Sequence, residues 1–217
     1  MCQNKGDTSF DLDGTLLDTL GDLTAAMNRT LTRHGLPERT RQQMRTALGN
    51  GARRLMELSV PSGTDSALFE TLLAEYNADY AAHCRIETAP YPGVAALLRT
   101  LHTQGRKLAI VSNKPDDAVR ALRADFFADA VQIAVGETAA IRRKPAPDML
   151  LAAMEQLGAD PDKTVFVGDS EVDIATARAA NLPCISVLWG FRDRDVLERA
   201  GAQQFAADAG ELARLLD

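Results

Sequence analysis

The apolar and polar positions along the chain predict a parallel sheet whose strands alternate with helices. Each predicted strand is a short, mostly apolar run, and each predicted helix has apolar residues three and four positions apart. This alternation is typical of an α/β fold with helices on both faces of the sheet. The predicted strands are 10–12, 107–112, 131–135, 164–168 and 184–188, and the predicted helices are 94–103, 116–124, 147–157 and 172–180.

The pattern changes between residues 19 and 87, where helical periodicity continues without a convincing strand. Apolar residues recur there at helical spacing, for example at Leu20, Leu23 and Met27. The Pro-rich segment 89–93 then returns the chain to the alternating pattern, and such segments often mark a boundary. We therefore expect an α/β core formed by residues 1–18 and 88–217, with an inserted all-helical unit formed by residues 19–87.

Composition narrows the class of protein. The 217 residues include 30 acidic and 24 basic side chains, and this net charge of −6 repels phosphate backbones and anionic lipids. We therefore expect no nucleic-acid partner.

No apolar run approaches the ~18 residues that span a membrane, and the first residues do not resemble a signal peptide. Three widely spaced cysteines are typical of free thiols, so we expect a cytoplasmic enzyme or binding protein, and its oligomeric state stays open.

The first predicted strand leads into two carboxylates, Asp11 and Asp13. Residues two apart in an extended chain point to the same side, so both side chains face the carboxyl edge of the sheet, where open α/β sheets bind ligands. Two like charges this close are both ionised only at a high energetic cost, unless a cation lies between them. The pair therefore indicates a metal site, an acid, or both.

Three further polar residues follow later strands of the predicted sheet. Asp169 ends one strand, and because parallel strands share an edge, it can reach Asp11. Carboxylates without a His or Cys cluster suit Mg²⁺ better than Zn²⁺. Ser112 ends another strand and Lys144 follows a third. A hydroxyl and an ammonium at that edge can neutralise the oxygens of a phosphoryl group, which predicts a small phosphorylated partner.

Four motifs, in order along nearly the whole chain, resemble those of the haloacid dehalogenase superfamily of phosphohydrolases. Within that superfamily the sequence is similar to the phosphoglycolate phosphatase-like group, which has a helical cap. The resemblance implies a doubly wound, Rossmann-like parallel sheet with the cap inserted after the first strand. The matching segments are Asp11 to Thr19, Ser112 to Lys114, Lys144 to Pro145, and Gly168 to Asp173.

The resemblance also implies a role for each residue of the motifs. Asp11 is expected to attack phosphorus and form an aspartyl-phosphate. Asp13 is expected to protonate the leaving oxygen and then to activate water. The remaining expected roles are Mg²⁺ binding by Asp11, the Asp13 backbone carbonyl, Asp169 and Asp173, phosphoryl contact by Ser112 and Lys144, and further substrate contact by Thr15 and Asn113.

In relatives the helical insert closes over the core and contacts the part of the substrate beyond the phosphate. Here the insert has eight Arg and no Lys, which argues against a phosphonate-cleaving relative that needs a cap Lys for a Schiff base. The segment Leu48 to Arg54 resembles the cap loop of phosphoglycolate phosphatases. We therefore expect Arg53 to bind a substrate carboxylate, because its planar fork suits bidentate recognition.

The expected function is Mg²⁺-dependent hydrolysis of a small phosphomonoester, with 2-phosphoglycolate as the first candidate. The alternatives are an inorganic pyrophosphatase, a sugar-phosphate phosphatase, a β-phosphoglucomutase-like isomerase, or a non-catalytic binding module. Asp13 argues against carbon–halogen cleavage, because dehalogenating relatives lack this second Asp. A non-catalytic module would be expected to lack some of the four residues Asp11, Asp13, Lys144 and Asp169, and all are present.

One segment departs from the pattern expected of a parallel strand, and another has no expected role in the site. Thr8 and Ser9 precede the catalytic motif, where a central parallel strand is usually apolar. This indicates a first strand that is short or partly frayed, or an altered N-terminus. The segment Trp189 to Phe191 follows the last predicted strand near the active edge, and we interpret it as loop packing.

Overall fold

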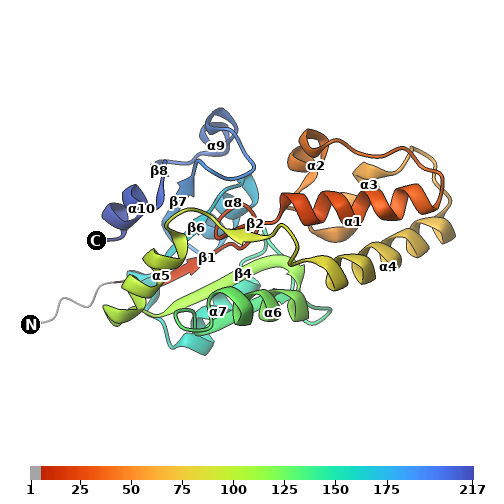
Figure 1. The fold of residues 1–217 in the computed structure, drawn as a ribbon. Helices are drawn as coiled ribbons and strands as arrows, with labels where there is room; N and C mark the ends of the chain where they lie inside the picture. The colour runs from red at the N-terminus through yellow and green to blue at the C-terminus, as the bar shows by residue number, and fades with distance from the viewer. Residues whose placement is uncertain (1–5) are drawn as a thin grey trace, which may run out of the picture. The chain divides into compact units, whose positions relative to one another are not determined.

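The computed structural model describes residues 6–217 and divides the chain into two compact units (Figure 1). The first unit contains the chain up to Leu17 together with Pro90–Asp217, and the second contains Asp18–Ala89. The chain passes between them at β2 (Leu17–Asp18) and β3 (Ala89–Pro90), which form a two-stranded sheet. Among the described residues, no helix has both the length and the apolar character needed to cross a membrane.

The first unit is built on a six-stranded parallel sheet with the strand order β5-β4-β1-β6-β7-β8. From β1 the chain continues to β4 and β5 on one side, and then crosses to β6, β7 and β8 on the other. The ends of β1, β4 and β6 therefore lie at the point where the strand order reverses, which is where open α/β sheets bind ligands. The strands are β1 (Thr8–Phe10), β4 (Leu108–Pro115), β5 (Ile133–Glu137), β6 (Val165–Gly168), β7 (Cys184–Val187) and β8 (Gln204–Ala206).

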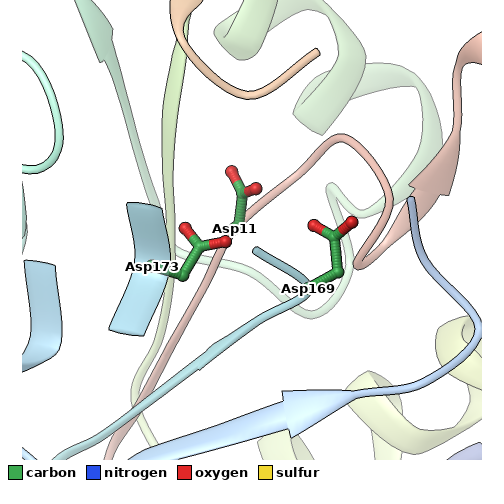
Figure 2. A group of neighbouring side chains, drawn as sticks. All are labelled: Asp11, Asp169 and Asp173. Carbon is green, nitrogen blue, oxygen red and sulfur yellow. The ribbon is translucent and has the colours of Figure 1, made fainter. Parts of the chain in front are cut away.

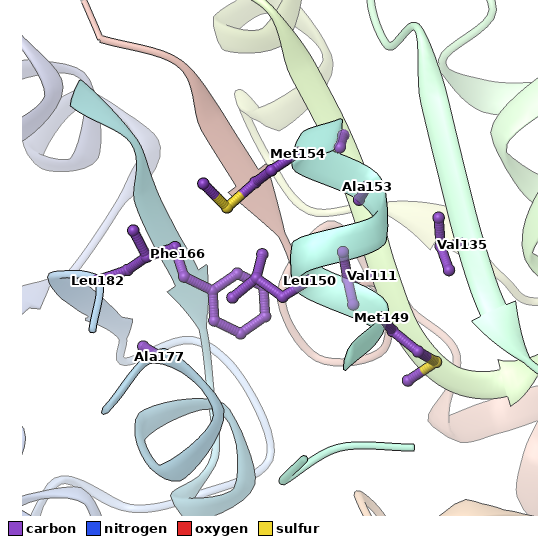
Figure 3. Packing of buried hydrophobic residues seen from close by; sticks show 10 residues of the cluster. Val111, Val135, Met149, Leu150, Ala153, Met154, Phe166, Ala177 and Leu182 are labelled. Atoms are coloured by element: carbon purple, nitrogen blue, oxygen red, sulfur yellow. The ribbon is translucent and has the colours of Figure 1, made fainter. Parts of the chain in front are cut away.

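Helices pack against this sheet through apolar side chains. Met149 and Leu150 of α7 pack with Val111 of β4 and Phe166 of β6 in one buried cluster (Figure 3). Alternate residues of a strand point to one face, so this cluster forms the core on one side of the sheet. The helices of the unit are α5 (Val94–Thr103), α6 (Asp116–Phe126), α7 (Asp148–Leu157), α8 (Glu171–Ala179), α9 (Arg194–Ala200) and α10 (Ala209–Leu216), with a 3₁₀ turn at Pro161–Lys163.

The predicted α/β fold with a parallel sheet is confirmed, and the differences are local. The sequence pattern did not predict β8, α9 or α10. The strand expected at 131–135 begins at Ile133, because Val131 closes the turn after α6 by donating its backbone N–H to Phe127. The strand expected at 107–112 continues to Pro115 through the polar residues Asn113 and Lys114.

The second unit is entirely helical apart from its linkers. Buried Asp79 of α4 joins α4 to α1, because its carboxylate accepts hydrogen bonds from Arg29 and Arg33. Buried Asp22 of α1 accepts hydrogen bonds from the backbone N–H groups of residues 86–88, which fixes the returning linker. The helices are α1 (Leu20–Arg33), α2 (Arg41–Ala47), α3 (Gly51–Ser59) and α4 (Ser66–His83).

The first strand, β1, is three residues long and carries two buried hydroxyls in the middle of the sheet. Thr8 and Ser9 are completely buried between β4 and β6. Neither hydroxyl has a hydrogen-bond partner among residues 6–217. A buried polar group without a partner destabilises the folded state, because it has given up its hydrogen bonds to water.

Replacing Thr8 with Val is therefore expected to stabilise the protein. Val keeps the branched shape and removes the unpaired hydroxyl, so the free energy of unfolding should rise by about 1 kcal/mol. Urea unfolding measures the change. The matched control is Thr176→Val on α8, where the buried hydroxyl donates to the Val172 carbonyl, and this change should bring no gain. A Thr8→Val variant less stable than the wild type would contradict the expectation.

Candidate active site

Three buried aspartates gather where β1 and β6 end (Figure 2). Asp11 follows β1, Asp169 follows β6, and Asp173 lies in the first turn of α8. Each offers one carboxylate oxygen, and these three oxygens lie within 4.8 Å of one another. The side chains are almost closed to solvent, because the relative exposure of the three residues is 7%, 1% and 0%. The sequence pattern predicted that Asp11 and Asp169 would meet, and the sheet brings them together.

Local backbone features place these carboxylates. The N–H of Asp11 donates to the Val167 carbonyl at 2.8 Å, which continues the pairing of β1 with β6 beyond the last strand residue. Gly14 has a φ of +83° and lies so close to Asp169 that a Cβ atom would overlap the Asp169 carboxylate. Ser170 and Asp173 form a capping box at the start of α8. One oxygen of Asp173 is thereby fixed, and the other faces the site.

Lys144 lies among these carboxylates and is itself buried. Its ammonium is 2.8 Å from Oδ1 of Asp11 and 2.6 Å from Oδ1 of Asp173. Burial alone would lower the pKa of Lys144, but the charges of Asp11 and Asp173 outweigh it and the pKa is raised. Lys144 is therefore a fixed positive charge beside Asp11 at any physiological pH.

Three carboxylates and one ammonium leave an excess of negative charge in a largely buried cluster. Burial raises the pKa of Asp11 well above its usual range, and the charge of Asp173 acts in the same direction. Burial also raises the pKa of Asp169 to about 7, again with Asp173 adding to the effect. The cost of ionising these groups falls when a cation binds between them. The oxygen donors and the uncompensated charge fit a divalent cation with a preference for oxygen ligands.

Asn113 and Lys144 are joined by two hydrogen bonds. The side-chain amide of Asn113 donates to the Lys144 carbonyl at 3.0 Å, and its oxygen accepts from the Lys144 N–H at 2.8 Å. Both residues are buried, and the peptide bond between Lys144 and Pro145 is cis. Asn113 thus connects the end of β4 to the backbone that carries the Lys144 side chain. The substrate contact expected of Asn113 stays a prediction.

The other motif residues lie in the same unit around the cluster. Thr15 donates through its hydroxyl to Oδ1 of Asp169 at 3.3 Å. Ser112 is buried within β4, and its hydroxyl accepts from the Lys114 N–H. Lys114, to which the sequence reasoning gave no role, places its ammonium 3.0 Å from Oδ1 of Asp13. The Asp13 side chain keeps 20% of its surface exposed, so water reaches it. The position of Lys114 directly after Ser112 and Asn113 in the motif was the available signal.

Arg53 belongs to α3 of the helical unit. Its guanidinium forms a bidentate ion pair with Glu70 of α4, at 2.8 and 2.9 Å, and lies over the ring of Phe69. About half of the Arg53 side chain is exposed. Its expected contact with a substrate carboxylate stays a prediction.

Comparison with known proteins agrees with this fold. Residues 9–187 match the haloacid dehalogenase-like hydrolase family. A phosphoglycolate phosphatase of Pseudomonas putida is 36% identical over 192 residues, which cover 84% of this chain and 69% of the relative. An N-acetylmuramic acid 6-phosphate phosphatase of Pseudomonas aeruginosa is 32% identical over 210 residues, covering 96% and 93% of the two chains.

Solved structures of similar fold are also related to phosphatases by name. A candidate phosphoglycolate phosphatase from Lactobacillus delbrueckii subsp. bulgaricus superposes with a TM-score of 0.92 at 35% identity and covers 98% of both chains. A predicted phosphoglycolate phosphatase from Haemophilus somnus gives a TM-score of 0.90 at 25% identity, covering 99% of this chain and 100% of that one. The family match and the α/β fold define a hydrolase, and its acidic cluster lies at the carboxyl edge of the sheet. The chain belongs to the haloacid dehalogenase-like hydrolase family, and within it the protein is a phosphatase.

Proposed function

We propose that this phosphatase uses Mg²⁺ to hydrolyse a small phosphomonoester that carries a carboxylate, with 2-phosphoglycolate as the first candidate. The observation that carries the proposal is the buried cluster of Asp11, Asp169 and Asp173 around the Lys144 ammonium. The cluster combines a carboxylate held beside a fixed cation with an excess of negative charge suited to Mg²⁺. Both features favour phosphoryl transfer from an anionic substrate.

The proposed reaction has two steps, and Asp11 is free before the first step and again after the second. In the first, a carboxylate oxygen of Asp11 attacks phosphorus, the ester P–O bond breaks, and Asp13 gives its proton to the leaving oxygen. In the second, Asp13 takes a proton from water, the water oxygen attacks phosphorus, and phosphate leaves Asp11. Asp13 suits this role because its side chain is partly exposed and can meet water.

The remaining residues of the site would hold charge in place during both steps. Lys144 keeps the Asp11 carboxylate oriented and would stabilise the phosphoryl oxygens, and the buried Ser112 hydroxyl would donate a hydrogen bond to them. The residues proposed to hold Mg²⁺ are Asp11, Asp169, Asp173 and the Asp13 backbone carbonyl. When bound there, the ion would reduce the electrostatic repulsion between the anionic nucleophile and the anionic substrate.

The substrate class rests on the named relatives. One is named for phosphoglycolate and another for N-acetylmuramic acid 6-phosphate. Both of these compounds combine a phosphomonoester with a carboxylate, although one is a two-carbon acid and the other an amino sugar. The shared carboxylate supports a substrate that carries a carboxylate. The relative named for N-acetylmuramic acid 6-phosphate makes a sugar-phosphate phosphatase the specific alternative.

A substrate panel tests this proposal. We expect phosphate release from 2-phosphoglycolate with the highest kcat/KM, and the alternative predicts N-acetylmuramic acid 6-phosphate instead. N-acetylglucosamine 6-phosphate is the matched control, because it lacks the lactyl carboxylate of the muramic compound. Equal kcat/KM for all three esters would contradict selection of a carboxylate.

Removal of the metal is expected to abolish turnover. Chelation by EDTA leaves the carboxylates of the cluster unscreened, so hydrolysis of p-nitrophenyl phosphate should fall to background and return when Mg²⁺ is added in excess. A phosphate-release assay measures both states. Undiminished activity in EDTA would contradict the proposed metal.

The Arg53→Ala variant is expected to raise KM for 2-phosphoglycolate and to leave KM for p-nitrophenyl phosphate unchanged. A charge-assisted bidentate contact contributes about 1.5–3 kcal/mol, so the rise should be about tenfold or more. Arg54→Ala is the matched control, because Arg54 is adjacent on α3 and pairs with Glu57. Equal effects of Arg53→Ala on both substrates would remove Arg53 from carboxylate recognition.

A further inference from the structure

Four consecutive residues between β7 and α9 contact the loops that carry the site. We name the segment Trp189–Arg192 the brace. It follows β7, which pairs with β6, so it lies beside the loop that presents Asp169. The sequence pattern predicts only loop packing for residues 189–191, whereas two residues of the brace contact Asp169 of the acidic cluster.

Two residues of the brace contact Asp169 directly. The backbone N–H of Phe191 donates to Oδ2 of Asp169 at 2.7 Å in a fully buried position. The α-carbon of Gly190 lies so close that a Cβ atom there would overlap both the Asp169 side chain and the Gly14 carbonyl oxygen. The Asp169 carboxylate therefore cannot rotate without losing the Phe191 hydrogen bond, and glycine is required for this approach.

The ends of the brace attach to the two neighbouring loops. The indole N–H of Trp189 donates to the Thr15 carbonyl at 3.0 Å, and Thr15 belongs to the loop that follows Asp11. Arg192 forms a bidentate pair with Glu171 at the start of α8, at 2.8 and 3.2 Å, and Arg192 is nearly buried. The brace thus links the loop after β1 to the loop after β6.

We infer that the brace positions Asp169 for metal binding: Gly190 and Phe191 contact the Asp169 side chain, and Trp189 anchors the brace to the loop after β1. This inference rests on the proposed Mg²⁺ site. Groups that orient a metal ligand from behind typically change metal affinity by about 10–100-fold when they are altered, since the ligand then has to be reordered on binding. The contacts of Gly190 and Phe191 with Asp169 are of this kind, and no other residue of the cluster is held by the brace in the contacts described above.

Direct measurement of Mg²⁺ affinity tests the inference. Isothermal titration of Mg²⁺ into metal-free protein should show a dissociation constant about 10–100-fold higher for Gly190→Ala than for the wild type. Trp189→Phe keeps an aromatic side chain but removes the N–H donor and part of the indole ring, so a rise of several-fold is expected. The matched control is Gly210→Ala, the same change on α10, whose added Cβ would meet only Asp208 and Arg214 and should leave the constant within twofold.

A second readout separates positioning of the metal ligand from general damage. Saturating Mg²⁺ should restore most of kcat in both brace variants, because only the affinity has changed. If Gly190→Ala does not fold, Trp189→Phe decides the question. A dissociation constant within twofold of the wild type in every folded brace variant overturns the inference, as does a kcat that excess Mg²⁺ does not restore. A wild-type protein that binds no Mg²⁺ overturns the proposed function as well.

Discussion

The Asp11→Asn variant is expected to lose phosphatase activity by about 10⁴-fold or more, as is typical when a covalent nucleophile is removed. The amide has nearly the same shape as the carboxylate, so it fits the buried position between β1 and Lys144. It is neutral and a poor nucleophile, and it cannot form the aspartyl-phosphate. Hydrolysis of p-nitrophenyl phosphate at saturating Mg²⁺ measures the loss.

The stability of this variant gives an internal control. Because the pKa of Asp11 is raised in the folded protein, its contribution to stability is full below the pKa of the unfolded chain and is lost as pH rises through the folded value. Ionisation of Asp11 therefore destabilises the metal-free protein as pH rises. Asp11→Asn removes this effect, so its melting temperature relative to the wild type should increase with rising pH.

These two measurements separate chemistry from folding. An inactive variant that melts at or above the wild-type temperature at pH 8, without metal, supports Asp11 as the nucleophile. Activity within tenfold of the wild type would contradict that role, because a neutral amide cannot replace a carboxylate in this step.

Loss of Lys144 is expected to have the second largest effect, and to change both activity and stability. The Lys144→Met variant keeps a long apolar stem and removes the charge that faces Asp11 and Asp173. Breaking a buried ion pair from one side typically costs about 3–5 kcal/mol, because the remaining charges stay buried. We expect kcat/KM to fall by about 10³-fold, comparable to the removal of a donor that stabilises transition-state charge.

The pH dependence identifies the cause of the instability. Asp11, whose pKa is raised by burial, loses its cation in this variant and can take up a proton in acid, so the stability difference between Lys144→Met and the wild type should shrink from pH 8 to pH 5. Lys163→Met is the matched control, because Lys163 is half exposed and pairs with Asp160 at the surface. Its free energy of unfolding should stay within about 0.5 kcal/mol of the wild type. Urea unfolding at both pH values measures the difference, and a Lys144→Met variant as stable as the control at pH 8 would contradict the ion-pair argument.

The end of β4 shows why sequence patterns place strand boundaries only approximately. The apolar run stops at Ser112, so the pattern ends the strand there, whereas the structure continues it to Pro115. Asn113 and Lys114 are polar yet buried, because Asn113 is paired with the Lys144 backbone and Lys114 with Asp13. Periodicity measures hydrophobicity and cannot anticipate that partners from distant segments will satisfy polar groups in a strand.

The sequence by itself determined the α/β class, the order of the motifs and the shared sheet edge of Asp11 and Asp169. Parallel strands must present their carboxyl ends at one edge, so residues that end such strands lie along it. The pairing of β1 with β6 then brings Asp11 and Asp169 together. Only the tertiary structure decided that Asn113 holds the Lys144 backbone, that the brace contacts Asp169, and that the hydroxyls of β1 are left without partners. Each of these depends on how closely backbone atoms from separate loops or strands approach one another. Residue type and spacing along the chain do not predict that distance.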